Sequence, residues 1–122
     1  MEWEIEINAD RKYIEVMTSG TADKDSSLTM AIAIARKMRT NRIRKALIDH
    51  RGLSGVRGDS VDIAKRPKLL RLIGMLLDIR IAEIIKPEHF KHFKFFETAC
   101  TNQGFKVAIF QDKEEALVWL LG

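Results

Sequence analysis

Three short apolar segments, each followed by residues with helical spacing, constrain the fold of this chain most strongly. The segments lie at 45–49, 80–85 and 107–110. In the first, Ala46, Leu47 and Ile48 follow one another without an intervening polar residue, which is typical of a strand buried on both faces. Strands that alternate with helices form a largely parallel sheet with right-handed crossovers. The pattern therefore predicts an α/β fold.

The start of the chain predicts an antiparallel hairpin at one end of this sheet. Trp3, Ile5 and Ile7 alternate with glutamates, the period-two pattern of a strand with one solvated face. A second strand is predicted over 13–17, after turn-forming residues at 8–11. The expected sheet is mostly parallel and five-stranded, with one antiparallel strand from the opening hairpin.

About four helices are expected to connect and cover these strands. The first runs from a cap at 25–27 to about Asn41 and has one apolar stripe. The second begins at a cap at 59 or 60, and we expect it to end at Pro67 because proline disrupts a helix interior. The other two are predicted over 89–102 and from a cap at Asp112 onward.

The composition indicates one globular domain over 1–122. Hydrophobic residues make up 46% and charged residues 31%, a balance that supports a core and argues against disorder. The single cysteine, Cys100, excludes a disulfide scaffold and a four-cysteine zinc module. The longest apolar run, 30–35, is too short to cross a bilayer, and the acidic start lacks the features of a secretory signal. We therefore expect a cytoplasmic domain without a transmembrane segment.

Basic residues are concentrated in the middle third of the chain. Residues 36–80 contain thirteen Lys and Arg against four Asp and Glu, whereas both flanking segments are net acidic. Such a patch can attract nucleic acid, anionic lipid or an acidic protein surface. Several of these cations fall in the last turns of the first predicted helix, where they offset the helix dipole. We favour this second explanation, and nucleic-acid binding is the weakest of the functional hypotheses.

The loop after the buried strand at 45–49 is the candidate binding surface. In open α/β sheets, ligands bind beyond the carboxyl ends of the strands, where loops and helix N-termini meet. Glycines at 52, 55 and 58 permit left-handed backbone and close approach, and the amides of the next helix start would favour an anion. The candidate residues for binding a protein partner or an anion are Asp49, Arg51, Ser54, Arg57, Asp59 and Ser60. The alternative is a connection whose glycines only turn the chain.

A leucine-rich stretch at 69–77 holds more apolar residues than one amphipathic helix face needs. It would line a pocket for a small apolar ligand or form the interface of a homodimer. The candidate residues for either surface are Leu69, Leu72, Ile73 and Leu76.

The sequence contains no recognisable catalytic or metal-binding motif. Asp49 and His50 are adjacent on a strand and point to opposite faces, so they do not readily pair in a hydrolase triad. His89 and His92 are three residues apart, but two ligands hold zinc poorly. We therefore expect no enzymatic activity, no cofactor and no metal.

Several segments carry a family resemblance that covers essentially the whole chain. They are ALIDHRG at 46–52, DIA at 62–64, FETA at 96–99, NQGF at 102–105, VAIF at 107–110 and EALVWL at 115–120. Together with the element order, they resemble the SpoIIAA-like branch of the STAS and SEC14-type domains. The resemblance implies a non-enzymatic regulatory domain that binds a protein partner, as anti-sigma-factor antagonists do. Its SEC14 side implies the alternative, binding of a small apolar or lipid-like ligand.

The phosphorylation switch of the anti-sigma-factor antagonists does not extend to this sequence. In those proteins, phosphorylation of one serine at a helix N-terminus, within a motif of aspartate, two hydroxyl residues and glycine, releases the domain from its partner. The corresponding residues here are Asp59, Ser60, Val61 and Asp62. Because the phosphorylated position falls on Val61, we expect no stoichiometric phosphate at residues 59–62.

Overall fold

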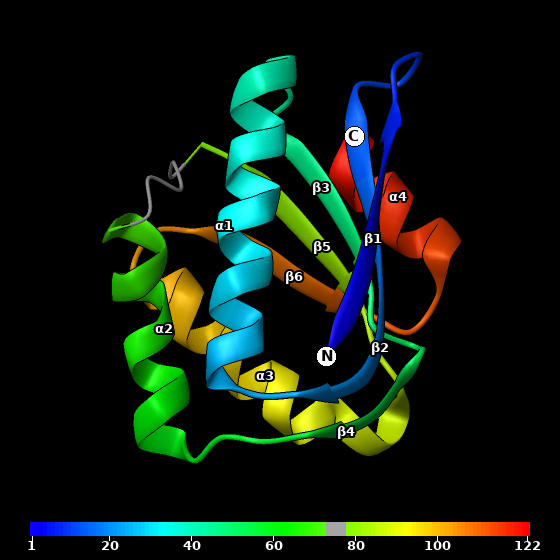
Figure 1. The fold of residues 1–122 in the computed structure, drawn as a ribbon. Coiled ribbons are helices and arrows are strands. Elements are labelled where there is room, and N and C mark those ends of the chain that lie inside the picture. Colours follow the sequence, from blue (N-terminus) through cyan, green and yellow to red (C-terminus); the bar gives the residue numbers. More distant parts are fainter. Residues whose placement is uncertain (73–77) are drawn as a thin grey trace.

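The computed structural model describes residues 1–72 and 78–122, and within them the chain forms one mixed sheet with helices on both faces (Figure 1). The strands are β1 (Glu2–Asn8), β2 (Tyr13–Ala22), β3 (Lys45–Asp49), β4 (Leu53–Val56), β5 (Arg80–Ile84) and β6 (Lys106–Phe110). The α-helices are α1 (Lys24–Asn41), α2 (Ser60–Leu72), α3 (Phe90–Asn102) and α4 (Lys113–Leu121), with a 3-10 turn at Pro87–His89. None of the described helices is long and apolar enough to cross a membrane.

The sheet is mostly parallel, as the sequence predicts, with an antiparallel hairpin at its start. Its strand order is β1-β2-β3-β5-β6, and only the β1–β2 pair is antiparallel. The predicted number of five strands is wrong, because β4 forms inside the predicted loop and pairs with β2. The physical reason is the length of β2, which continues to Ala22 and presents backbone groups beyond the end of β3. Residues 53–56 satisfy those groups.

Two helix boundaries also differ from the predictions. α1 begins two to four residues earlier than predicted, because Asp23 caps it rather than a residue at 25–27, and the Ser26 side chain completes a capping box. α2 continues through Pro67 to Leu72. The Pro67 ring is fully buried, so its packing offsets the hydrogen bond that proline cannot donate.

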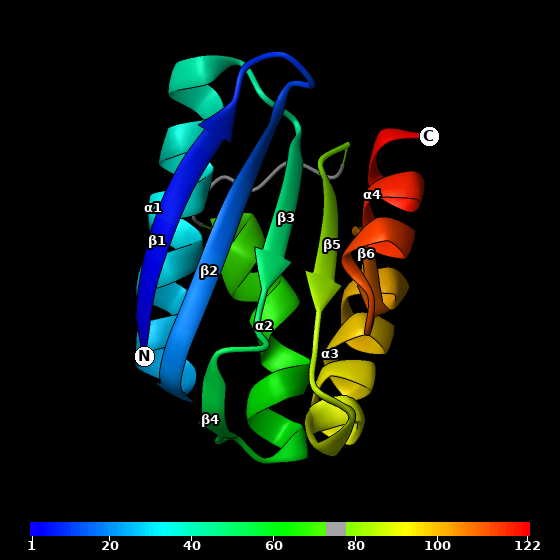
Figure 2. The same ribbon diagram turned by 90° about the vertical axis from the view of Figure 1, so that its right-hand side faces the viewer.

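The two faces of the sheet are covered unequally (Figures 1 and 2). We call the side covered by α1, α2 and α3 the three-helix face, and the other side, covered by α4, the α4 face. Side chains alternate along the strands, so Ile48 joins the core under α1 and α2 whereas Leu47 packs with Ala116 and Leu120 of α4. Each face therefore has its own apolar core.

Candidate functional site

The predicted loop lies at the edge of the sheet where the parallel strands end, which we call the carboxyl edge (Figure 2). The chain leaves β3 at this edge, returns along the end of β2 as β4 and enters α2. The structure thus brings the predicted residues to one rim of the molecule. The exposed ones, which we call the carboxyl-edge surface, are Arg51, Ser54, Arg57, Asp59 and Ser60, while Asp49 is partly buried behind them.

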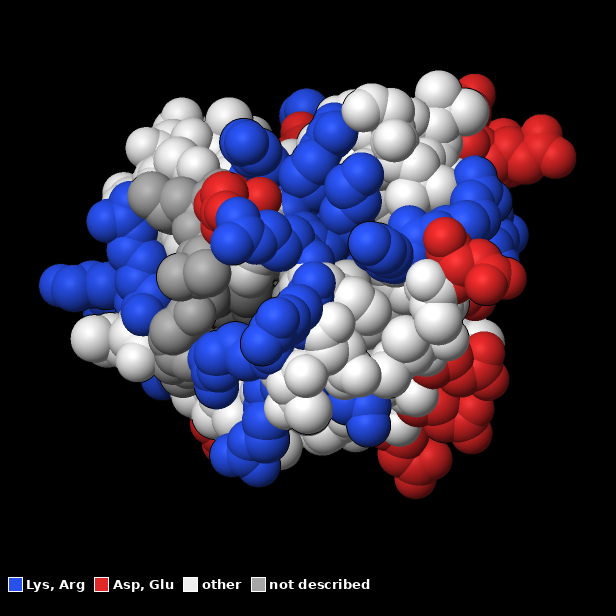
Figure 3. All heavy atoms as spheres, turned by 90° about the horizontal axis from the view of Figure 1, so that it is seen from above, with Lys and Arg blue, Asp and Glu red and all other residues white. Residues whose placement is uncertain are grey.

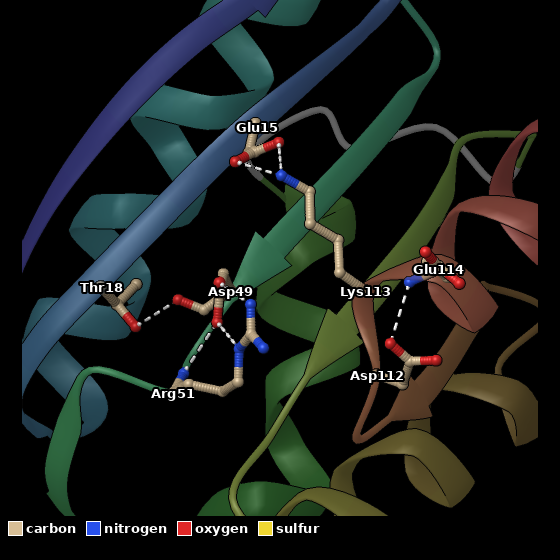
Figure 4. Close-up of polar contacts among 7 residues, drawn as sticks. All are labelled: Glu15, Thr18, Asp49, Arg51, Asp112, Lys113 and Glu114. Carbon is tan, nitrogen blue, oxygen red and sulfur yellow. Dashed lines mark hydrogen bonds and ion pairs between the residues drawn. The ribbon is translucent and has the colours of Figure 1, made fainter.

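Asp49 and Arg51 form a two-pronged ion pair on the α4 face (Figure 4). Nε and Nη2 of Arg51 donate to the two carboxylate oxygens of Asp49 at 3.0 and 2.8 Å, and the backbone N–H of Arg51 donates to Oδ1 at 3.0 Å. Burial acts to raise the pKa of Asp49, but these hydrogen bonds outweigh it and hold the pKa below its ordinary value. Asp49 therefore orients Arg51.

The α4 face near this pair carries an ion pair that the sequence analysis missed (Figure 4). Lys113 at the start of α4 binds Glu15 of β2, with Nζ 3.0 Å from Oε1. Asp112 caps α4, as predicted, by accepting from the Glu114 N–H at 3.2 Å. Glu15 and Lys113 are far apart in the sequence, so no local pattern indicates that they pair. The contact ties the last helix to the second strand.

Two of the three loop glycines have a structural requirement. A Cβ at Gly52 would lie 2.3 Å from the backbone oxygen of Thr18, so only glycine lets the loop pass this close to β2. Gly58 has a φ of +131°, which side-chain-bearing residues rarely adopt. A Cβ at Gly55 would make only ordinary contacts with Thr21, so the structure does not require glycine at this position.

The start of α2 is capped by Asp59, one of the two predicted cap residues. Its Oδ1 accepts from the Asp62 N–H at 2.8 Å, and its backbone oxygen accepts from the Ile63 N–H at 3.0 Å. Asp59 thereby places its own negative charge at the helix start, which disfavours a second anion there. This local charge argues against a phosphate bound at the start of α2.

The cations of the basic middle third are spread over α1, α2 and both edges of the sheet. Residues 39–45 bring several of them to the opposite, amino edge, where Lys and Arg side chains gather (Figure 3). Some have local partners: Arg44 pairs with Asp78, and Arg80 lies 4.4 Å above the Trp119 ring. Arg51 and Arg57 lie at the carboxyl edge instead. Nucleic-acid binding stays a prediction.

A cavity of about 80 Å³ lies on the three-helix face, between the sheet and the helices. Its walls are largely apolar, but His50 and Glu83 also line it. Sequence reasoning considered His50 only beside Asp49, and it overlooked Glu83. The available signal was a carboxylate inside the otherwise apolar run at 81–85.

The leucine-rich stretch contributes to this cavity only in part. Leu69 lines it, as the apolar-pocket hypothesis expects, together with Leu70. Leu72 is 76% exposed and does not line the cavity, because it lies on the outer side of α2. Ile73 and Leu76 lie outside the described residues. The homodimer hypothesis stays a prediction.

No family model matches the sequence, and no curated protein matches it either. Solved structures do match over nearly the whole chain. The anti-sigma factor antagonist SpoIIAA in its unphosphorylated form aligns at a TM-score of 0.55 with 17% identity, over 99% of this chain and 99% of that chain. An anti-sigma factor antagonist from Mycobacterium paratuberculosis aligns at 0.61 with 10% identity, over 98% and 94%. A DUF3478-family protein with a SpoIIAA-like fold from Shewanella loihica aligns at 0.56 with 22% identity, over 98% and 92%.

The chain has the SpoIIAA-like fold. The resemblance inferred from the sequence is thus confirmed at the level of the fold. In this SpoIIAA-like fold, Ser60 begins α2 and Val61 is 60% exposed beside it. Val61 is therefore accessible, but its side chain has no hydroxyl group that could carry phosphate.

The single cysteine of the chain is poorly placed to act as a nucleophile. Cys100 is buried, and this burial raises the pKa of its thiol, so the nucleophilic thiolate is disfavoured. Among residues 1–72 and 78–122, no three His, Cys, Asp or Glu side chains are grouped as metal ligands would be.

Proposed function

We propose that this chain is a non-enzymatic regulatory domain that binds a protein partner through the carboxyl-edge surface. The SpoIIAA-like fold supports the proposal, because two of the solved structures that share it are anti-sigma factor antagonists. The observation that carries it is the exposure of Arg51, Ser54, Arg57 and Ser60 on one rim, beside the start of α2. Function is often found on loops that a rigid scaffold positions.

The chemistry of this surface indicates what a partner would offer. The Arg57 guanidinium makes no hydrogen bond or ion pair with any described residue, and Val61 nearby is 60% exposed. Asp49 holds the Arg51 guanidinium in one orientation, which reduces the entropy lost on binding. An acidic group next to a small apolar contact would complement these side chains. Regulation by phosphate on residues 59–62 is not part of the proposal, and stoichiometric phosphate on Ser60 in cells would contradict this point.

A charge-reversal experiment tests the proposal. Arg51→Glu combined with Arg57→Glu reverses two cations of the carboxyl-edge surface, and the matched control Arg36→Glu plus Lys37→Glu reverses two exposed cations of α1. We would quantify the partner captured from cells by each protein. We expect the wild type and the control to capture the same amount of the same partner, and the Arg51→Glu plus Arg57→Glu variant to capture at least ten-fold less. Thermal melting verifies that each variant is folded. Equal capture by all three proteins would discard the carboxyl-edge surface as the binding site.

A further inference from the structure

The amino edge, where β2, β3, β5 and β6 begin, is strongly basic (Figure 3). Four segments lead into these strands, at 9–12, 39–45, 78–80 and 102–106. Together they hold eight Lys and Arg against two Asp. One of the two acidic residues, Asp78, is already paired with Arg44. The edge therefore keeps a clear excess of positive charge.

Three of these cations form a row across the sheet. Lys45, Arg80 and Lys106 are the first residues of β3, β5 and β6, and the strand register places them beside one another. Arg80 lies above the Trp119 ring of α4, so the row is on the α4 face. Like charges on neighbouring strands repel. The row does not belong to α1, so offsetting the dipole of that helix does not explain it.

Two further cations occupy a backbone conformation that favours glycine. Lys12 in the turn between β1 and β2 has a φ of +57°, and Arg42 at the end of α1 has a φ of +55°. In the part of the chain that the structure describes, they are the only residues other than glycine with a positive φ. Glycine adopts this conformation at lower cost, yet both positions hold an exposed cation.

Most of these cations are available to a molecule outside the chain. The side chains of Lys12, Arg42, Lys45 and Lys106 make no hydrogen bond or ion pair with any described residue. Arg80 is only covered on one side by the Trp119 ring. The edge thus offers at least four charged donors that the fold itself does not use.

The neutral side chains beside these cations are polar. Residues 40–41 at the end of α1 and 101–103 at the end of α3 are exposed Thr, Asn and Gln. Such hydroxyl and amide groups bond to phosphate and sugar oxygens, as Lys and Arg do. A bilayer would instead favour aromatic side chains that insert between lipids. The exposed aromatic residues of the described chain, Phe90 and Phe95, lie in the first half of α3, which begins at the carboxyl edge.

We propose that the amino edge binds double-stranded nucleic acid through its phosphate backbone. The guanidinium groups offer paired donors that match the oxygens of a phosphate, and the Lys side chains add charge. A duplex is favoured over a single strand, because the described residues of this edge include no exposed aromatic side chain on which unpaired bases stack. This function is separate from the binding of a protein at the opposite, carboxyl edge.

The salt dependence of binding tests the proposal. We would titrate the wild-type chain into a fluorescent DNA duplex of about 20 base pairs and measure its anisotropy from about 50 to 200 mM salt. The logarithm of the binding constant should fall linearly with the logarithm of the salt concentration. We expect a slope of about −3 to −4, because four unpartnered cations each release about 0.9 counterion. No duplex binding at the lowest salt, a slope near zero, or tighter binding to phosphatidylglycerol vesicles than to the duplex would overturn the proposal.

A pair of glycine substitutions tests the location. Lys12→Gly combined with Arg42→Gly removes two cations of the amino edge. The matched control, Lys24→Gln plus Lys91→Gln, removes two exposed cations at the starts of α1 and α3, on the carboxyl edge. At about 100 mM salt, we expect the first variant to bind the duplex at least ten-fold more weakly, with a slope shallower by about 2. The control should bind like the wild type.

Thermal melting separates this role from a structural one. Because glycine adopts a positive φ without strain, the Lys12→Gly plus Arg42→Gly variant should melt no lower than the wild type while it loses the duplex. Duplex binding that is equal in all three proteins would show that the amino edge is not the binding site.

Discussion

The two faces of the sheet differ in how their helices pack on the strands. On the α4 face, one helix covers the centre of the sheet with fully buried Ala116 and Leu120. The polar groups of that face lie at its rim, where Asp49 pairs with Arg51 and Glu15 with Lys113. On the three-helix face, the helices leave a cavity and enclose a carboxylate, Glu83, at its wall. The α4 face is therefore closely packed, whereas the three-helix face is filled less completely.

A matched pair of leucine truncations would show the largest difference between the faces. Leu120 of α4 is fully buried, whereas Leu70 of α2 lines the cavity. We expect Leu120→Ala to reduce the free energy of unfolding by about 4 kcal/mol and Leu70→Ala by about 2 kcal/mol. The reason is that part of the Leu70 surface already faces empty space and has fewer contacts to lose. Urea unfolding measures both values, and equal losses would show that the two cores are packed alike.

A substitution where the loop crosses β2 should lower the free energy of unfolding by an intermediate amount. Gly52→Ala places a methyl group against the Thr18 carbonyl, and relieving the clash requires a backbone shift that costs about 2 kcal/mol. Because Thr18 also holds His50, the shift should reach the cavity as well as the loop. Gly55→Ala, where the nearest atom would be 3.6 Å away, is the control and should change stability by less than about 0.5 kcal/mol. Thermal melting of the two variants decides between these outcomes.

The smallest expected effect is a difference between the two faces in how their titratable groups make the stability of the fold depend on pH. Burial, assisted by the positive charge of Arg66, lowers the pKa of His92 on the three-helix face below 6.5. As the pH falls, His92 therefore binds a proton in the unfolded chain before it does so in the folded chain. The contribution of His92 to stability is thus present above pH 6.5 and is lost as the pH falls below it. His92→Gln should flatten the stability profile just below pH 6.5.

The α4 face should respond in a separate, more acidic range. Since the pKa of Asp49 is lowered from 3.8, its contribution is present above that pH and is lost as the pH falls through the lower value of the folded state. Asp49→Asn should therefore leave the profile near pH 6.5 unchanged. Urea unfolding of the two variants from pH 7.5 to 3 checks both windows, and a shared window would contradict the assignment of the two groups to different environments.

Much of the fold could be predicted from local patterns. The alternation at Trp3, Ile5 and Ile7 and the apolar run at 46–48 correctly predict their strands, because the spacing of apolar residues reflects which conformation buries them. β4 could not be predicted in this way. Residues 53–56 form a strand only because β2 extends far enough to offer partners.

The residues of the candidate site likewise include some that local patterns predict and some that they do not. The position of Asp49, Arg51 and Asp59 at the carboxyl edge follows from the chain order of strands and helices, since loops after parallel strands share one edge. The predicted end of the second helix at Pro67 is wrong, because rules based on local sequence do not include the packing of a buried proline ring. The proximity of His50 and Glu83 at the cavity was missed because the two residues come from separate segments of the chain, 33 positions apart.

By itself, the sequence determined the types and order of the helices and of every strand except β4, and the edge to which the glycine-containing loop goes, since these depend on residues close together in the chain. Only the tertiary structure decided that Thr18, His50 and Glu83 meet beside a cavity. These residues are separated by 32 and 33 positions. Their contact depends on strand register and helix packing, which are properties of the whole folded chain.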